Sequence, residues 1–290
     1  MIVVTTAPAL LARLVDDAAT DPDGVVPLPE AIEDHRSRRA SARHGEVIGA
    51  LVVRASAVPD LLRVAAIDGL EVAVIADTGL ERLGAVVNQL HAARVLVRRV
   101  EVAVAMRGED PVPGVRRLIA VAGALSTEGT GGQVAVHAEI PLAGGMLDAL
   151  DLLAGADAAT GATFRIGGLA AELFPAPATL AGVLCACRDR GLRFTVNAGL
   201  HRALRHNDPE TGFTHHGVLN LLAACLLAAA GASVPLVAER LTATDPLPLL
   251  EIVRARRDSP RPLWTAMTSG RVDDLIADFT GLGLLPQATS

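Results

Sequence analysis

The feature that most constrains the fold is a strand-like pattern that returns at nearly regular intervals along the chain. Residues 71–77 read EVAVIAD, residues 101–105 read EVAVA, and residues 133–140 read QVAVHAEI. In each segment valines alternate with small or polar residues, which is the two-residue period of a β-strand. Similar segments lie at residues 48–53, 163–166 and 193–197, so the six segments begin 23 to 32 residues apart.

Ala-, Leu- and Arg-rich stretches between these segments are typical of helices, and strands that alternate with helices form a parallel sheet. A doubly wound sheet would have strands that are apolar on both faces, whereas here one face is valine and the other is alanine plus charge. We therefore predict an α/β fold of the (β/α)8 TIM-barrel type, with the alternate residues in the lumen. The candidates for the two closing strands are residues 249–253 and 263–267, with residues 2–5 as a competitor.

The length of 290 residues fits one barrel domain over residues 1–290, since such barrels form single domains of about 250 residues or more. We expect residues 1–45 to be an N-terminal helical extension packed on the barrel. The polar segment at residues 204–212 (LRHNDPETG) is predicted to lie over the barrel mouth.

Composition removes whole classes of chemistry. All 26 basic residues are arginine, and the chain has no tyrosine. Without lysine there is no Schiff-base aldolase chemistry, no pyridoxal-phosphate aldimine and no P-loop lysine. A net charge of −6 and 2% aromatic residues argue against a nucleic-acid partner.

The cysteines and the absence of a targeting pattern predict a cytoplasmic protein. Cys185, Cys187 and Cys225 lack metal-ligand spacing and suggest a reducing compartment. The N-terminus has no signal-peptide pattern. The longest apolar run, residues 218–230, contains Asn220 and is too short to cross a membrane, so we expect no membrane partner.

Strand alternation sorts the inward-facing polar residues by depth. Four of them stand at strand starts, where we predict a structural charge network at the bottom of the barrel: Glu71, Glu101, Gln133 and Arg193. At the other end the inward set is Arg54, Asp77, His137, Glu139, Arg165 and Asn197, with His201 just beyond. Active sites of such barrels are built at this C-terminal end.

Two of these groups suggest specific chemistry. His137 and Glu139 lie two residues apart on one strand, so they could perform acid–base catalysis or bind a metal; the alternative is a hydrogen-bonded histidine that fills the lumen. Arg165 followed by Gly167 and Gly168 could hold a carboxylate or phosphate, because arginine offers a fork of donors and glycines expose backbone N–H groups. The two glycines could equally form a turn into the next helix.

Residues 197–220 contain four of the eight histidines: His201, His206, His215 and His216. We favour His201 and His216 as proton-transfer groups, and His206, with Arg54 and Asn197, as a substrate-binding residue. The spacing matches no specific zinc pattern.

At these residues the chain resembles an uncharacterised family of bacterial barrel proteins. Its strands carry K-x-R-[TC]-G-G and K-A-T-A-G-L-H-H, followed by an H-G-F-L-N helix start and a G-S-C-S-F-type segment. The first two motifs are similar to the lysine strands of class I aldolases such as deoxyribose-phosphate aldolase. The resemblance is best over residues 130–225 and retains Arg165, Gly167, Gly168, Glu172, Phe174, Pro175, Ala198, Gly199, Leu200, His201, His206, Gly212, His216, Gly217 and Asn220.

The departures from the family pattern concern its lysines. Thr163 and Thr195 stand where the pattern has lysine, Arg202 replaces the second histidine of the His-His pair, and the C-terminal segment reads only MTSG at residues 267–270. Either the chemistry has moved to histidine and carboxylate groups, or catalysis is lost.

The residues support three hypotheses. The first is a lysine-independent lyase or isomerase without a cofactor that acts on a small anionic metabolite. In it Arg165 and the two glycines hold the anion, His137 with Glu139 or Asp77 moves a proton, and His201 is the complementary acid. The second is a metal-dependent enzyme that holds a divalent ion with His137 and Glu139 together with one or two further histidines; His201 is the first choice among His201, His206 and His216. The third is an inactive barrel that binds a partner, such as a lysine-bearing paralogue; a homo-oligomer also remains open.

Overall fold

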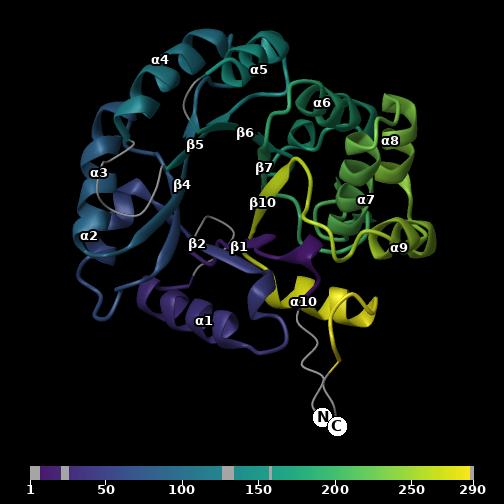
Figure 1. Ribbon diagram of the computed structural model, residues 1–290, viewed down its shortest axis with the longest axis horizontal. Coiled ribbons are helices and arrows are strands. Elements are labelled where there is room, and N and C mark those ends of the chain that lie inside the picture. Colours follow the sequence, from purple (N-terminus) through teal and green to yellow (C-terminus); the bar gives the residue numbers. More distant parts are fainter. Residues whose placement is uncertain (1–6, 21–25, 126–133, 157–158, 288–290) are drawn as a thin grey trace.

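The structure, a computed structural model, describes residues 7–20, 26–125, 134–156 and 159–287. Eight parallel strands close into a barrel in the order β1-β10-β7-β6-β5-β4-β3-β2 (Figure 1). The strands are β1 (Val15–Asp17), β2 (Ile48–Arg54), β3 (Glu71–Ile75), β4 (Leu96–Ala103), β5 (Ala135–Glu139), β6 (Thr160–Arg165), β7 (Phe194–Asn197) and β10 (Trp264–Ser269). The predicted α/β barrel with parallel strands is therefore confirmed.

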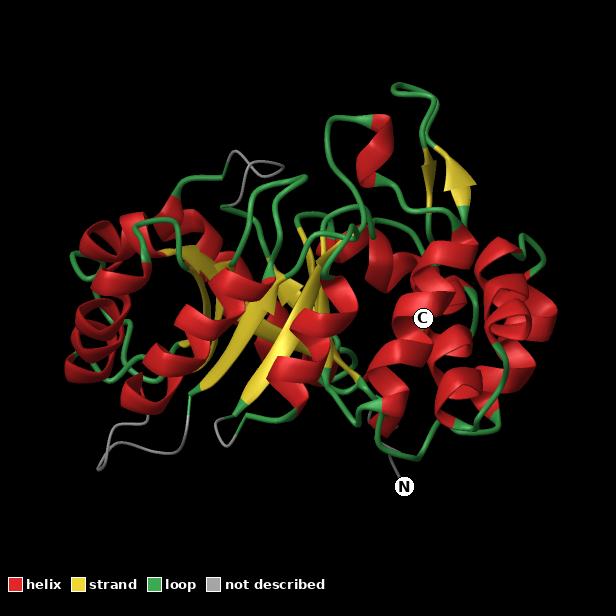
Figure 2. Cartoon of the chain, turned by 90° about the horizontal axis from the view of Figure 1, so that it is seen from above, coloured by secondary structure: helices red, strands yellow, loops and turns green. Residues whose placement is uncertain are grey.

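Helices surround the barrel (Figure 1). They are α1 (Leu28–Ala40), α2 (Val58–Leu61), α3 (Leu80–Ala92), α4 (Val112–Ala122), α5 (Met146–Ala154), α6 (Pro177–Asp189), α7 (Val218–Ala229), α8 (Val234–Thr242), α9 (Pro246–Arg254) and α10 (Val272–Gly281). Between β7 and β10 the chain adds α7, α8 and α9, in which α7 packs against both others. A two-stranded hairpin of β8 (His206–Asn207) and β9 (Thr214–His215) precedes α7, and Figure 2 shows it projecting beyond the barrel strands.

The two faces of the strands are apolar in different ways. Valines and leucines of β2 and β3, such as Leu51, Val72 and Val74, belong to the large core shared with the helices. The alternate residues Ala50 and Ala73, with Val52, form a small separate cluster. On β2 and β3 the predicted alternation is confirmed for the alanines and for the large residues that face the helices, whereas Val52 is a larger apolar residue in the separate cluster.

Strand β4 begins earlier than predicted, so Glu101 does not lie at the N-terminal end of the barrel, where the sequence placed it. β4 starts at Leu96, five residues before Glu101, because the arginines at 98 and 99 conceal the alternation in the sequence. Glu101 consequently lies within the strand, in register with His137 of β5, and not at the bottom of the barrel. Arg99 occupies the lower position on β4. Gln133, another predicted bottom residue, lies outside the described residues.

The closing strands correct a second prediction. Residues 264–269 form β10, close to the predicted 263–267, but residues 249–253 lie in helix α9, so that strand candidate is wrong. The Asp245 side chain accepts a hydrogen bond from Leu247 N at 3.0 Å and caps the N-terminus of this helix. The strand prediction rests on the short apolar segment 249–253 and overlooks this capping residue. Residues 2–5 lie outside the described residues.

The eighth strand is β1, which pairs with β10 and β2. It lies within the segment 1–45, for which the sequence predicts a helical extension. Helix α1 is present there, but β1 is part of the barrel itself, so this segment closes the barrel and is not an appendage. In the described ranges no helix is both long and apolar enough to cross a membrane.

Candidate functional site

A cavity of about 470 Å³ opens at the C-terminal ends of β4, β5 and β6. We call it the mouth cavity. Its charged lining residues are Arg107, Glu139, Arg165 and Glu172, and its walls include Ile140, Leu142, Leu173, Phe174 and Pro175. Glu139 ends β5 and Arg165 ends β6, so the barrel brings them together because the carboxyl ends of parallel strands meet at one face.

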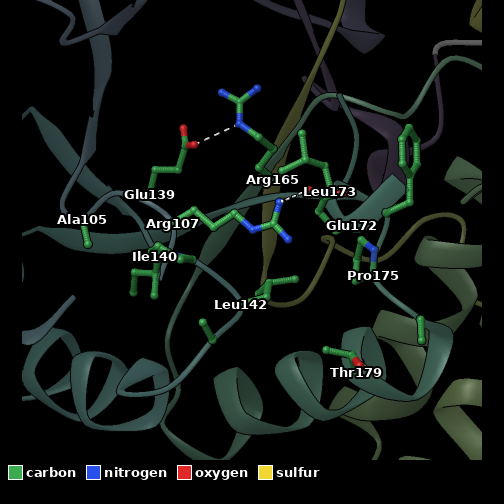
Figure 3. Close-up of a pocket in the computed structure, with 14 residues that line it drawn as sticks. Ala105, Arg107, Glu139, Ile140, Leu142, Arg165, Glu172, Leu173, Pro175 and Thr179 are labelled. Atoms are coloured by element: carbon green, nitrogen blue, oxygen red, sulfur yellow. Dashed lines mark hydrogen bonds and ion pairs between the residues drawn. The ribbon is translucent and has the colours of Figure 1, made fainter. Parts of the chain in front are cut away.

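Two ion pairs hold the charged groups of the mouth cavity (Figure 3). Arg165 Nε donates to Glu139 Oε1 at 3.0 Å, and Arg107 Nη1 donates to Glu172 Oε1 at 2.7 Å. Hydrogen bonding to its own backbone N–H and to Arg107 lowers the pKa of Glu172. The side chains of Arg165 and Glu139 are 45% and 23% exposed, so both are accessible to a small ligand.

A second cavity of about 410 Å³ lies beside the hairpin. We call it the histidine cavity, and it is lined by Gly168, Leu169, Gly199, His201, Arg202, His206, Asp208, Pro209, Glu210, Thr211, His215 and Arg271. The predicted residues His201 and His206 both lie here, and not in the mouth cavity. Phe174 connects the two, because it lines the mouth cavity and its ring centroid lies 4.6 Å from that of His215.

His215 is the central residue of the histidine cavity. It is buried, its Nδ1 lies 3.3 Å from Gly199 O and its Nε2 lies 3.7 Å from Asp208 Oδ2. Its ring stacks on His206 with centroids 5.2 Å apart and lies 6.0 Å from the ring of His201. Burial lowers the pKa of His215, so at neutral pH the cavity presents an uncharged imidazole.

Inside the barrel the polar residues form a buried hydrogen-bond network. Thr163 and Thr195 are fully buried and their hydroxyls lie 2.6 Å apart. Glu101 accepts from Arg99 Nε at 2.5 Å, from Asn197 Nδ2 at 2.5 Å and from Thr195 Oγ1 at 3.4 Å. Burial raises the pKa of Glu101, but the charge of Arg99 and the hydrogen bonds outweigh it and leave this pKa below its usual value.

His137 belongs to this network and not to the mouth cavity. Its Nδ1 lies 3.2 Å from Thr195 Oγ1, so the expected pairing with Glu139 is not seen; Glu139 pairs with Arg165 instead. His137 lines a cavity of about 300 Å³ at the other end of the barrel, together with Ala135 and Arg193, which we call the lower cavity. Burial, followed by the charge of Arg99, lowers the pKa of His137 to about 4.

The other predicted mouth residues occupy separate positions. Asp77 accepts from Ser56 N at 2.9 Å and from Ser56 Oγ at 2.5 Å. Burial opposes the shift, but these bonds, with a contribution from Arg54, lower the pKa of Asp77. Asn197 is buried, and its carboxamide oxygen accepts from Thr268 Oγ1 at 3.3 Å. Arg54, Asp77 and Asn197 are not among the residues that line the mouth or histidine cavities.

His216 has structural contacts. It is 1% exposed, its Nε2 donates to Pro175 O at 2.8 Å, and its Nδ1 accepts from Arg205 Nη1 at 3.3 Å. Burial lowers the pKa of His216 to about 4. With both ring nitrogens engaged, the imidazole connects the start of α7 to the segment before α6.

The two glycines after Arg165 differ in what they do. A Cβ on Gly167 would lie 2.4 Å from Gly199 Cα, so Gly167 allows the ends of β6 and β7 to touch. Gly168, with a φ of +154°, lines the histidine cavity. The predicted anion site of Arg165, Gly167 and Gly168 is therefore not formed as one unit, because Gly168 lines the histidine cavity and Arg165 lines the mouth cavity.

The donor groups that could hold a metal ion lie apart. In the part of the chain that the structure describes, no group of three or more His, Cys, Asp or Glu side chains is arranged to hold a metal ion. His137, Glu139 and His201 in particular line three different cavities.

Sequence reasoning missed Arg107, Arg99 and the central position of His215. β4 ends at Ala103 and Arg107 lies in the loop that follows it, so a rule that selects the last residues of each strand does not find this arginine. No family model matches the chain, and a search of curated proteins finds no significant similarity.

Proposed function

We propose that this protein is a barrel enzyme of the lyase or isomerase class, which binds a small carboxylate or phosphate metabolite in the mouth cavity and moves a proton with Glu139. The observation that carries this proposal is the contact between Arg165 and Glu139 at 3.0 Å on the wall of that cavity. It combines an anion-binding group and a Brønsted base at the end of the barrel where such sites are built.

The accessibility of this pair suggests how substrate binding prepares the base. Solvent-exposed ion pairs contribute little net free energy, so a substrate anion can replace Glu139 on the Arg165 guanidinium. Guanidinium groups bind carboxylate and phosphate through two parallel hydrogen bonds. The released Glu139 carboxylate then lies next to the bound anion, where it can accept a proton from the adjacent carbon.

The remainder of the mouth cavity fits the same chemistry. Arg107, held by Glu172, supplies a second guanidinium, and Ile140, Leu142 and Leu173 form an apolar wall for a short carbon skeleton. With no lysine in the chain, the negative charge left by proton removal would be stabilised by the two arginines and not by an imine. A positioned general base contributes about 10²- to 10⁴-fold in rate.

The experiment is proton exchange, which can be measured before the complete reaction has been identified. The protein is incubated in D2O with a panel of small carboxylates and phosphate monoesters, and deuterium incorporation is followed by NMR. We expect exchange into one chemical class, a loss of about 10²-fold or more in Glu139→Gln, and a raised KM in Arg165→Gln. Glu81→Gln, in α3, is the matched control and should behave as the unchanged protein.

A second candidate is a binding protein without catalysis, and the packing of Thr163 against Thr195 favours it. The sequence resemblance implies lysine at these two positions, whereas the two buried hydroxyls form a hydrogen-bonded pair with each other. This candidate would be supported if one compound of the panel binds saturably and Arg165→Gln weakens that binding. Proton transfer would be rejected if deuterium exchange in the unchanged protein is no faster than in Glu139→Gln. Exchange that is unchanged in Glu139→Gln would also reject the assignment of the base.

A further inference from the structure

The lower cavity, at the N-terminal ends of the strands, is lined by an unusual number of arginines. Five line it: Arg13, Arg98, Arg99, Arg193 and Arg261. Asp16 is the one acidic residue among its described lining residues. The sequence predicts a structural charge network at this end of the barrel, whereas the described cavity lining carries five arginines and one carboxylate.

The charges around the lower cavity are not balanced. Arg13, Arg39 and Arg98 all contact Glu71, with Arg98 Nε at 2.7 Å from Glu71 Oε2, so one carboxylate serves three guanidiniums. Arg261 donates to four backbone carbonyls, those of Leu10, Ala12, Trp264 and Thr265. Carbonyl oxygens satisfy its hydrogen bonds but do not neutralise its positive charge.

Arg99 adds an unsatisfied donor to this cavity. It is 5% exposed, its Nε donates to Glu101 at 2.5 Å and its Nη1 to Asp16. Its Nη2 is buried and has no hydrogen-bond partner within the described ranges. Buried polar groups nearly always have a partner, and a buried donor on a charged group is costly to leave unmade. An oxyanion in the lower cavity would supply the missing acceptor.

The arginines are attached to different strands around the barrel, and this arrangement indicates the shape of the ligand. Arg13 precedes β1, Arg98 and Arg99 lie on β4, Arg193 precedes β7 and Arg261 precedes β10, so the guanidiniums approach from several sides of the barrel. A planar carboxylate is suited to a single fork, whereas a tetrahedral oxyanion offers acceptors in all directions. We propose that the lower cavity is a binding site for a phosphate group, either inorganic phosphate or a small phosphate monoester, distinct from the mouth cavity.

This site is tested by isothermal titration calorimetry at pH 7 and constant ionic strength. Because the mouth cavity is itself proposed to bind anions, every titration uses the Arg165→Gln background, so that the two proposals fail independently. The probes are inorganic phosphate, methyl phosphate and acetate. Arg98→Gln with Arg193→Gln removes two lining charges without touching Arg99 or the carbonyl contacts of Arg261. Arg82→Gln with Arg116→Gln, on the exposed faces of α3 and α4, removes the same charge elsewhere.

We expect saturable binding of inorganic phosphate, weakened about tenfold or more by the lining pair of substitutions and unchanged by the control pair. Methyl phosphate that binds as well as inorganic phosphate identifies a monoester site, and exclusive binding of inorganic phosphate identifies a site for the free ion. The proposal is overturned if phosphate does not bind saturably, or if the lining pair and the control pair of substitutions weaken phosphate binding equally. It is also overturned if acetate binds as tightly as phosphate.

Discussion

At the scale of single residues, the close approach of β6 and β7 at the mouth depends on a pair of glycines. The ideal Cβ on Gly167 would lie 2.4 Å from Gly199 Cα and 2.6 Å from Gly199 N. Gly199 itself has a φ of +74°, a conformation that glycine adopts without steric cost. This contact holds the end of β6, where Arg165 lines the mouth cavity, against the segment after β7, where Gly199 lines the histidine cavity.

We therefore expect Gly167→Ala to destabilise the protein by about 1–3 kcal/mol, because the neighbouring backbone cannot move aside as a flexible side chain would. Gly182→Ala, within α6, is the matched control. Nothing lies within 4 Å of a Cβ at Gly182, so there the change should stabilise the helix by about 0.5–1 kcal/mol. Urea unfolding measures both. Equal effects of the two substitutions would show that the Gly167–Gly199 contact does not matter for stability.

At the scale of elements, His216 fixes the start of α7. Its imidazole donates to Pro175 O, ahead of α6, and accepts from Arg205, so one neutral side chain ties together three segments of the chain. The stretch that follows the hairpin of the histidine cavity is held in place by this residue. A protonated ring could not accept from the Arg205 guanidinium.

This arrangement predicts a pH dependence of stability. The pKa of His216 is lowered to about 4, whereas an unfolded histidine has a pKa of about 6.5. Between these values the unfolded state binds a proton that the folded state does not, so stability is complete above about pH 6.5 and falls as the pH is lowered toward 4. His137, whose pKa is also lowered to about 4, adds to the same loss.

His216→Gln keeps a side chain that can donate and accept but cannot titrate. We expect it to reduce the slope of unfolding free energy against pH in this window, by up to about 1.4 kcal/mol per pH unit for one proton. Urea unfolding at a series of pH values from 4 to 7 gives the slopes. Parallel curves for the two proteins would contradict the assigned role of His216.

At the scale of the whole molecule, an ion-pair cluster spans the lumen. Asp16 on β1 and Glu101 on β4 both contact Arg99, although β2 and β3 separate these strands in the barrel order. Asp16 Oδ1 also accepts from Ala50 N at 2.6 Å on β2. The three-residue strand β1 is therefore held by these buried charges as well as by its backbone pairing.

We expect Arg99→Met to cost about 3–5 kcal/mol of unfolding free energy, because it leaves two carboxylates buried without their counter-charge. Adding Asp16→Asn and Glu101→Gln to the same chain removes those charges and should recover a large part of the loss. Urea unfolding of the single and triple variants provides the comparison. A triple variant that is less stable than Arg99→Met would refute the electrostatic explanation.

The sequence by itself determined the barrel, because period-2 alternation and regular spacing are local properties that do not depend on which strands become neighbours. It also determined that Arg165 and Glu139 end their strands at the mouth, and that lysine chemistry is excluded. It could not reveal β1, since three residues are too short for a periodic signal, nor the start of β4, where two arginines interrupt the apolar pattern.

Only the tertiary structure decided which polar groups meet. His137 and Glu139 share a face of β5, yet each is paired by strands that lie elsewhere in the sequence: His137 with Thr195 of β7, and Glu139 with Arg165 of β6. Alternation fixes the direction of a side chain, but its partner and its access to solvent depend on the register and tilt of neighbouring strands. For the same reason the convergence of five arginines on the lower cavity emerges only when the barrel is closed.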